Sequence, residues 1–505
     1  MPPAKITIIH PDLGIGGAER LIIDVALALQ SRGHPVTIYT SHRDKSHCFE
    51  EARDGTLDVQ VRGNTIFPAH VGGRLFVLMA ILRQLHLTWD LLFGETTSGD
   101  NGEGEEEEEV FIVDQMPACV PFLKVFGGKK NSRKQRILFY CHFPDQLLAR
   151  RDEGGSVLQL LKGLYRVPFD WFEGWAVSAS DKVVANSRFT RGVVSGVFGR
   201  EKVGDLSVVY PCVDTKAGDG GEGVVKDGEK LWGGKKILLS VNRFERKKDL
   251  ALAIRAYHGL GEEKRKGTRL VVAGGYSLLS GRRGCARCLL VERSVLTGCS
   301  LDAGGYDNRV QENVQYHREL DELATGLGLQ TATSKTVISA LSIPDSIDVL
   351  FLLSVPTAFR DTLLLQAKLL LYTPINEHFG IVPVEAMRAG VPVLASNTGG
   401  PLETIVEGET GWLRDAKVDA DWTAVMDKVL YGMKQEELDR MSVAAKERVE
   451  KEFSLTAMGE KLEQEIEEML GQEQRPFHGF QQLLTFLALV GVVLALAAAF
   501  LVKLL

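Results

Sequence analysis

The hydrophobic positions of this chain recur in one unit: a short apolar run, a glycine-containing turn and a stretch of helical periodicity. In the first unit an apolar run at residues 5–9 leads into a turn at 12–17 and a helical pattern over 18–31. A second apolar run follows at 36–40. Apolar runs that alternate with helical patterns predict βαβ units, and hence a parallel sheet covered by helices.

The same alternation restarts in the second half of the chain. An apolar run at residues 236–243 precedes a helical pattern over 250–260. Later apolar runs lie at residues 348–353, 368–372 and 391–396. The pattern therefore predicts an α/β protein whose two halves are built alike.

The two halves are separated by a change in composition. Residues 215–234 are rich in Gly, Asp and Lys, which indicates an exposed linker. A chain of 505 residues is also too long for one ordinary domain. We therefore predict an N-terminal Rossmann-like domain over residues 1–214 and a C-terminal one over 235–470. The charged helical stretch at 436–470 is expected to pack back across both domains.

Two segments interrupt the alternation. Residues 95–109 are acidic and end in five consecutive glutamates, so we expect a disordered insertion between strands at 91–93 and 110–113. Further on, Ala-Gly-Gly-Tyr occurs at residues 273–276 and again at 303–306. The stretch between, about 277–305, has no clear period and is interpreted as an extra surface insertion, with a retained intron in the gene as one hypothesis.

Three other segments are apolar enough to raise the question of a membrane. Residues 72–93 are interrupted by polar side chains such as Arg83, which favours a core helix over a helix in the membrane interface. Residues 158–179 mix aromatic and basic residues, which fits a core helix and a membrane-facing helix equally well. The stretch from 483 to 502 has about 20 residues without a charge, enough to span a bilayer. We predict a membrane anchor helix at 480–502, with the remaining chain on the cytosolic side.

Composition excludes some functions. The net charge of −7 argues against a nucleic-acid binder, because no basic face dominates. The seven cysteines are scattered and odd in number, which fits a reducing compartment. Cys285 and Cys288 form the only pair at metal-like spacing, and they lack the second pair that a zinc site needs. No metal site is therefore predicted.

The most informative candidate chemistry follows the apolar run at residues 368–372. Glu377 comes after the end of this expected strand, and a loop to Gly380 leads into a helix that contains Glu385. The carboxyl edge of a parallel sheet is where ligands bind, and a helix N-terminus there favours phosphate. Carboxylates eight residues apart do not share a helix face, so we interpret them as two contacts along one extended ligand and not as an acid–base pair.

Other candidates also follow strands. The cations Arg243 and Lys248 come after the run at 236–243, ahead of a helix, where a diphosphate could bind. His142 follows an apolar run at 137–141. In the turn at 12–17, Gly16 and Gly17 fit either a phosphate loop or a simple turn, and the sequence leaves both open.

A Rossmann oxidoreductase is disfavoured by two departures from its fingerprint. Glu19 replaces the third glycine, and no acidic residue ends the second strand at Tyr39 and Thr40.

The two glutamates and their surroundings resemble a known family. Glu377 and Glu385, with Phe379 and Gly380 between, resemble the signature of the retaining glycosyltransferases of family four, which have the GT-B fold. More specifically, the chain looks like the dolichol-pathway α-1,3/α-1,6-mannosyltransferases. Five segments carry this resemblance, at residues 11–20, 140–146, 209–214, 242–248 and 372–380.

The resemblance implies a fold, a reaction and a place in the cell. The two domains would face each other across a cleft, with acceptor bound by the first and nucleotide sugar by the second. The donor would be GDP-mannose, and the acceptor a dolichol-diphosphate-linked oligosaccharide that gains its second and third mannose. The enzyme would need no cofactor and no metal. It would lie on the cytosolic face of the endoplasmic reticulum membrane. Other early dolichol-pathway transferases are possible partners there.

The resemblance also implies roles for individual residues. The catalytic roles fall to His142, which would contact the sugar, and Glu377, which would lie near the reacting face of the mannose. The donor would be held by Gly16, Gly17, Arg243, Lys248, Phe379, Gly380 and Glu385. Among these, the two cations would neutralise the diphosphate and Glu385 would accept hydrogen bonds from the ribose. The alternative function is a membrane-tethered, non-catalytic nucleotide-sugar-binding subunit.

Overall fold

The computed structural model describes most of the two expected domains. The described residues are 3–45, 47–71, 75–94, 108–127, 135–148, 156–215, 230–274, 306, 310–474, 477, 479–485, 488 and 491–492. The insertion at 277–305, nearly all of the acidic run and most of the linker and of the expected anchor lie outside these residues, so those predictions stay untested.

The first half of the chain forms a seven-stranded parallel sheet with strand order β3-β2-β1-β4-β5-β6-β7. Its strands are β1 (Lys5–Leu13), β2 (Val36–Arg43), β3 (Asp58–Val61), β4 (Glu109–Asp114), β5 (Gln135–Cys141), β6 (Lys182–Ala185) and β7 (Ser207–Val208). The helices around it are α1 (Gly17–Ser31), α2 (Phe76–Phe93), α3 (Val120–Phe126), α4 (Asp145–Leu148), α5 (Ser156–Ser178), α6 (Arg188–Phe198) and α7 (Arg200–Val203).

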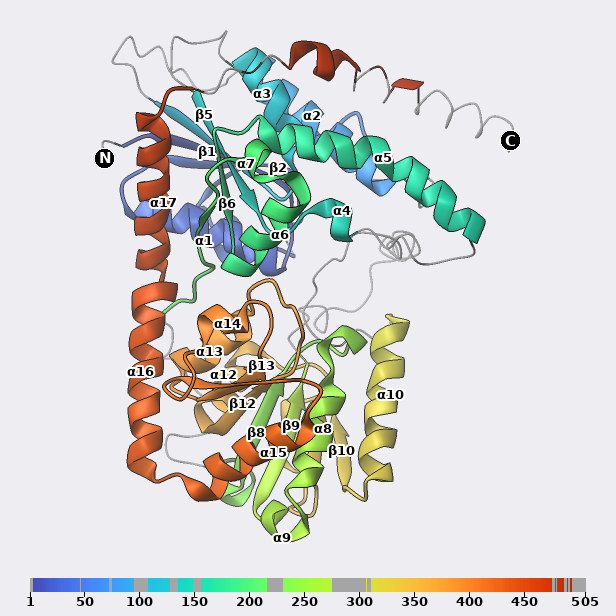
Figure 1. The fold of residues 1–505 in the computed structure, drawn as a ribbon, viewed down its shortest axis with the longest axis vertical. Helices are drawn as coiled ribbons and strands as arrows, with labels where there is room; N and C mark the ends of the chain where they lie inside the picture. The colour runs from blue at the N-terminus through green and yellow to red at the C-terminus, as the bar shows by residue number, and fades with distance from the viewer. Residues whose placement is uncertain are drawn as a thin grey trace.

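The second half repeats this architecture, with strand order β10-β11-β9-β8-β12-β13-β14. Its strands are β8 (Lys236–Val241), β9 (Thr268–Ala273), β10 (Thr331–Ser334), β11 (Val349–Leu352), β12 (Ala367–Tyr372), β13 (Val393–Ser396) and β14 (Gly411–Arg414). Its helices are α8 (Leu250–Gly259), α9 (Glu262–Arg265), α10 (Gln311–Gly326), α11 (Val337–Leu341), α12 (Thr357–Gln366), α13 (Ile381–Arg388), α14 (Pro401–Thr404), α15 (Asp419–Asp427), α16 (Gln435–Phe453) and α17 (Leu455–Gly471). The two units are stacked end to end (Figure 1).

Each sheet reverses its strand order once. In the first sheet the reversal lies between β1 and β4, and in the second between β8 and β12. Ligands of open α/β sheets bind beyond the carboxyl ends of the strands at such reversals. The residues that follow these four strands are therefore the ones that the fold presents to a ligand.

The long C-terminal helices join the two units along one side (Figure 1). The chain crosses back at Ser454, whose hydroxyl accepts a hydrogen bond from the Ala457 N–H and so caps α17. Beyond this cap, Leu462 and Ile466 are fully buried in the core of the first unit. The predicted return across both domains is thus observed. The segment 235–470, predicted as the second domain, includes one helix that packs on the first sheet.

Two local expectations were wrong. Residues 91–93, expected as a strand, form the last turn of α2, because Leu92 continues the buried helical face that begins at Leu78. Glu109, expected in the acidic insertion, is the first residue of β4, where Lys5 pairs with it in the parallel register.

The two ambiguous apolar segments are helices with both a core face and an exposed face. Among the described residues, α2 is the helix long and apolar enough to cross a membrane, and half of it is buried. It packs in the core as expected, yet Trp89 and Phe93 near its end are exposed. In α5, Phe172 is buried whereas Trp171 is exposed.

Candidate active site

The loop after β12 holds Glu377 in a network of polar side chains. The ammonium group of Lys248, from the 3₁₀ turn after β8, lies 2.6 Å from Glu377 Oε1. The Tyr372 hydroxyl donates a hydrogen bond to Glu377 Oε2 at 3.2 Å. The Thr373 hydroxyl donates to the backbone carbonyl of Lys248 at 2.6 Å and so ties the two loops together. The sequence predicted Lys248 and Glu377 as site residues, and the structure joins them directly.

This ion pair is half-buried, since 26% of the Glu377 side chain is exposed. Burial raises the pKa of Glu377, but the charge and hydrogen bond of Lys248 outweigh it, so the pKa of Glu377 lies below its ordinary value. The side chain of Lys248 is only 9% exposed. Glu377 is therefore a carboxylate at neutral pH, and Lys248 is a cation held at the carboxyl edge of the sheet.

A second loop fixes the backbone around Glu377. The Gly400 N–H donates to the Glu377 carbonyl at 2.8 Å. A Cβ atom at Gly399, where φ is +71°, would lie 2.6 Å from that carbonyl oxygen, and one at Gly400 would lie 2.1 Å from the Phe379 carbonyl oxygen. Only glycine permits so close an approach. The sequence analysis missed this pair, although Gly-Gly directly after a strand was a usable signal.

Glu385 lies one turn into α13 and is paired with Arg360 of α12. The Arg360 guanidinium approaches Glu385 Oε1 at 3.2 Å. Burial raises the pKa of Glu385, and the charge of Arg360 only partly opposes this. Arg360 was not predicted, because it lies inside a helix and no local pattern marks it.

The remaining predicted residues of the second unit lie around the same loop. Arg243 follows β8, and its charge lowers the pKa of Tyr372, although burial keeps that pKa well above the ordinary value. Arg243 also contacts Glu245 at 2.9 Å. Gly380 has φ of +85° and begins α13. The ring of Phe379 is buried and faces Tyr210 at 5.7 Å, so any ligand contact of Phe379 must come from its backbone.

In the first unit, His142 is held by a buried carboxylate that the sequence analysis missed. His142 Nε2 lies 2.6 Å from Asp114 Oδ1, and His10 Nδ1 lies 2.8 Å from Asp114 Oδ2. The three residues come from adjacent strands: His10 is in β1, Asp114 ends β4 and His142 follows β5. His10 and Asp114 are fully buried, whereas 19% of the His142 side chain is exposed.

Contacts between the two units bring His142 close to the Glu377 loop. The ring of Phe143 stacks on that of His378, with centroids 3.9 Å apart and planes 6° from parallel. The Ser187 hydroxyl donates to the His378 carbonyl. Glu403 accepts hydrogen bonds from the Arg188 and Phe189 N–H groups, at 2.8 and 3.2 Å, at the start of α6.

His378 is neutral in this setting. Burial lowers its pKa to about 4; Glu377 acts in the opposite direction, and Lys247, Lys248 and His142 add to the lowering. His142 adjoins Phe143, whose ring stacks on that of His378 in the Glu377 loop. A role of His142 at this site stays a prediction.

Gly16 and Gly17 begin α1, above the carboxyl end of β1. A Cβ atom at Gly17 would meet no described atom within 4 Å, so packing does not explain a glycine there. Contact of this turn with a donor stays a prediction.

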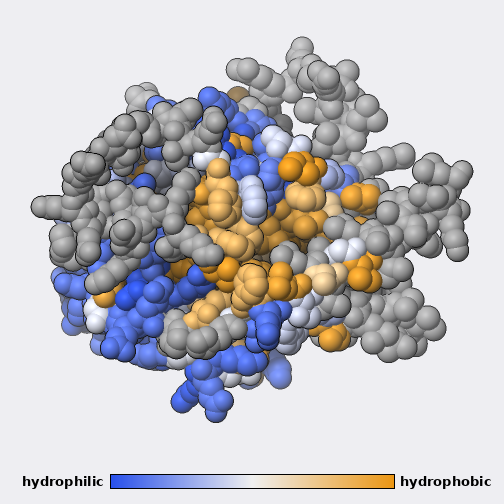
Figure 2. Space-filling view, turned by 90° about the horizontal axis from the view of Figure 1, so that it is seen from above, coloured by the Kyte–Doolittle hydropathy of each residue, from blue (hydrophilic) through white to orange (hydrophobic). Residues whose placement is uncertain are grey.

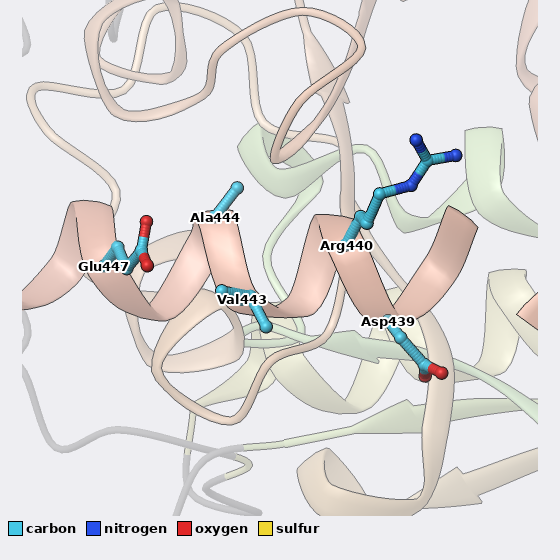
Figure 3. A pocket seen from close by; sticks show the side chains of 5 residues that line it. All are labelled: Asp439, Arg440, Val443, Ala444 and Glu447. Atoms are coloured by element: carbon cyan, nitrogen blue, oxygen red, sulfur yellow. The ribbon is translucent and has the colours of Figure 1, made fainter. Parts of the chain in front are cut away.

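A shallow hollow of about 360 Å³ lies elsewhere, over α16 (Figure 3). Its described lining comes from that one helix: Asp439, Arg440, Val443, Ala444 and Glu447. None of these residues belongs to the candidate site.

Known proteins resemble this chain over most of its length. The family model described as glycosyl transferases group 1 matches residues 318–448. The α-1,3/1,6-mannosyltransferase of Neurospora crassa is 48% identical over 472 residues, which is 92% of this chain and 90% of that protein. The corresponding protein of Saccharomyces cerevisiae is 39% identical, over 93% of this chain and 86% of its own.

The chain belongs to the α-1,3/1,6-mannosyltransferase family. The resemblance noted in the sequence is thereby confirmed. Solved structures agree on the fold of this mannosyltransferase family member. Sucrose-phosphate synthase of Thermosynechococcus elongatus matches with a TM-score of 0.60 at 15% identity, over 92% of this chain and 99% of that one. A glycosyltransferase from Rickettsia africae matches with a TM-score of 0.57 at 15% identity, over 94% and 100%. The two-sheet architecture is the GT-B fold, as predicted.

Proposed function

We propose that this protein transfers mannose from GDP-mannose to a dolichol-diphosphate-linked oligosaccharide and makes the α-1,3 and α-1,6 linkages of the N-glycan precursor. The names of its relatives support the sugar and the linkages. The observation that carries the proposal is the Lys248–Glu377 pair at the strand-order reversal of the second sheet.

The cations after β8 would bind the donor diphosphate. Arg243 and Lys248 both lie at the carboxyl edge of the sheet, next to the N-terminus of α13. Their charges are balanced by Glu245 and Glu377, at 2.9 and 2.6 Å. A diphosphate entering between them would share these cations with the carboxylates. Cations and helix N-termini together stabilise the charge that develops as the diphosphate leaves.

The two glutamates would contact the two ends of the donor. Glu385 would accept hydrogen bonds from the ribose hydroxyls, and Glu377 would lie beside the mannose. His142 is held by Asp114, and the next residue, Phe143, stacks on His378 of the Glu377 loop.

The reaction retains the configuration at the mannose C1 atom. The bond from C1 to the diphosphate oxygen breaks, and a bond from C1 to the acceptor hydroxyl oxygen forms on the same face. The acceptor proton passes to the departing diphosphate oxygen. The acceptor oxygen attacks C1 directly, so no protein nucleophile takes part in this scheme, and Glu377 is held by Lys248 and Tyr372.

An aromatic surface on the first unit supports a membrane-bound acceptor. We name it the aromatic face, and it consists of Trp89, Phe93, Phe126, Trp171, Trp175, Phe477 and Phe480. Its rings contact one another, as in Trp89–Phe93 at 4.5 Å and Trp175–Phe477 at 5.6 Å. Figure 2 shows apolar residues gathered over this end of the molecule. Aromatic side chains are favoured at membrane interfaces.

The chain leads from this face toward its apolar C-terminal stretch. Leu483 is buried against the first unit, while Phe480 and Leu484 beside it are exposed. We propose that residues 480–502 anchor the protein in the endoplasmic reticulum membrane, with both domains on the cytosolic side.

The deciding experiment supplies purified protein in detergent or vesicles with GDP-mannose and a one-mannose diphosphodolichol acceptor. Products with two and three mannoses are expected. Binding of GDP-mannose without product would instead support the non-catalytic subunit, and absence of both would overturn the proposed donor.

A further inference from the structure

The candidate site contains a carboxylate that touches no part of the Lys248–Glu377 network. Asp114 is fully buried, and each of its two oxygens faces a histidine ring nitrogen. Strand register places it there: Ile9 pairs with Val113, so His10 and Asp114 come next on adjacent strands, and Asp114 in turn pairs with Tyr140, two residues before His142.

The protonation of this triad follows from hydrogen-bond chemistry. Burial raises the pKa of Asp114, but the charges and hydrogen bonds of His142 and His10 outweigh it and hold the pKa below its ordinary value. Asp114 is therefore a carboxylate, which can accept hydrogen bonds but cannot donate one. Each ring nitrogen that faces it must carry the proton: Nε2 of His142 and Nδ1 of His10.

This arrangement fixes what His142 offers to a ligand. In a neutral imidazole, a proton on Nε2 leaves Nδ1 with a free lone pair. Among the described residues Nδ1 of His142 has no hydrogen-bond partner, and it is not one of the buried polar atoms, so it is open to a ligand. His142 adjoins Phe143, whose ring stacks on His378 of the Glu377 loop, beside which the proposed donor hexose would lie.

We propose that Asp114 is a positioning residue that holds His142 as the Nε2-protonated tautomer, so that Nδ1 accepts a hydrogen bond from a hydroxyl group of the donor hexose. His10 anchors the second oxygen of Asp114 and keeps the carboxylate from rotating away. The identity of the sugar rests on the proposed function. The tautomer of His142 can be measured without turnover.

The test compares Asp114→Asn with the wild type and with Asp181→Asn. Asp181 is a matched control, because it is also buried in the first unit and paired, with Lys124 at 2.5 Å, but it precedes β6 at the opposite edge of the sheet. In Asp114→Asn, kcat/KM for GDP-mannose should fall about 10- to 100-fold, the range expected for a hydrogen bond to a charged group. Inhibition by GDP, which lacks the hexose, should change by less than about twofold, as for a substitution away from its contacts.

The same substitution in a His142→Ala background separates positioning from folding. If Asp114 acts through His142, Asp114→Asn should add less than about a twofold loss there, because coupled residues are not additive. An equal loss in both backgrounds, or weakened inhibition by GDP, would overturn the proposal. Asp181→Asn should keep wild-type kcat/KM for the folded fraction.

A direct readout does not require activity. In protein labelled with ¹⁵N-histidine, the signal absent from His142→Ala identifies His142, and its ring shifts report the tautomer. The wild type should show Nε2–H, and Asp114→Asn should shift the population toward Nδ1–H. The same tautomer in both would overturn the proposal even if the enzyme is active. If the wild type transfers no mannose, the proposed function fails and this measurement still decides the role of Asp114.

Discussion

At the scale of single residues, the Lys248–Glu377 ion pair is the contact whose loss should have the largest effect. Replacing Lys248 with methionine keeps the length of the side chain but leaves Glu377, which is 26% exposed, with the Tyr372 hydroxyl and without a cation. Loss of one partner costs about 3–5 kcal/mol in a fully buried pair and less in a half-buried one, and loss of an electrostatic contact to a leaving group lowers kcat roughly 10²–10³-fold. We therefore expect Lys248→Met to lose nearly all transfer activity and to melt earlier than the wild type.

The matched control is Lys264→Met, because Lys264 pairs with Asp427 at 2.7 Å, 51% and 37% of the two side chains are exposed, and neither residue belongs to the candidate site. An exposed pair contributes about 0–1 kcal/mol, so this variant should stay near wild type. Thermal melting measures the stability of both variants, and single-turnover mannose transfer measures their activity. Equal effects of the two substitutions would show that Lys248 has no special role.

The surroundings of Glu385 predict the direction in which the pH dependence of kcat/KM should shift. Burial already raises the pKa of Glu385, and Arg360 is the main group that opposes this. In Arg360→Met the pKa of Glu385 should rise further, so protonation, which removes its capacity to accept from the ribose, begins at a higher pH. The acidic limb of kcat/KM for GDP-mannose should shift upward in pH, as a pH series would show. An unmoved limb would mean that Glu385 does not bind the donor in its charged form.

The sequence predicted those site residues that directly follow strands. Glu377, Lys248 and His142 each stand just after an apolar run, and the strand edges bring them together. Arg360 was missed because it lies inside a helix, and its partner is 25 residues further along the chain. Asp114 was missed because the strand before it looks complete at Val113, and nothing local reveals two histidines on the neighbouring strands.

At the scale of elements, the periodic units were predicted well and their ends were not. β1 runs to Leu13 and not to residue 9, because His10 pairs with Thr40 and continues the ladder through a segment without apolar periodicity. The break between α16 and α17 is a cap at Ser454, which a continuous charged pattern conceals. Secondary-structure propensity is a property of one segment at a time. The ends of these strands and helices are instead set by residues that they contact on other strands and in the other unit.

Helix α17 should contribute strongly to the stability of the first unit. Leu462 is fully buried against that unit, although it lies more than 200 residues beyond its last strand. Leu462→Ala should cost about 2–5 kcal/mol of unfolding free energy, as for other large-to-small core substitutions. Glu467→Ala, on the exposed side of the same helix, should change it by less than about 0.5 kcal/mol. Urea unfolding of both variants tests this, and equal midpoints would show that α17 is not part of that core.

At the scale of the whole molecule, the candidate active site and the proposed membrane contact lie at different ends of the first unit. The carboxyl edge of its sheet carries His142 toward the second unit, whereas the apolar surface of Figure 2 is seen from the opposite end of the molecule, above the first unit in Figure 1. An acceptor whose lipid stays in the bilayer must therefore extend its glycan past the first unit to reach the Glu377 loop. A membrane-facing first unit would orient the site relative to the bilayer, which a terminal anchor on its own does not.

This division predicts that two elements bind the membrane independently. Truncation after Phe480 should weaken, but not abolish, cosedimentation with vesicles, and adding Trp89→Ser and Trp171→Ser should release the truncated protein. Burial of a large apolar side chain contributes about 1.5–3 kcal/mol, so losing two such contacts should lower vesicle affinity by more than about tenfold. Val443→Ser is the control, because Val443 is equally exposed but lies on α16 at the hollow of Figure 3. Full release by truncation would mean that the aromatic face does not bind lipid. Wild-type cosedimentation by the combined variant would place the membrane contact on another surface.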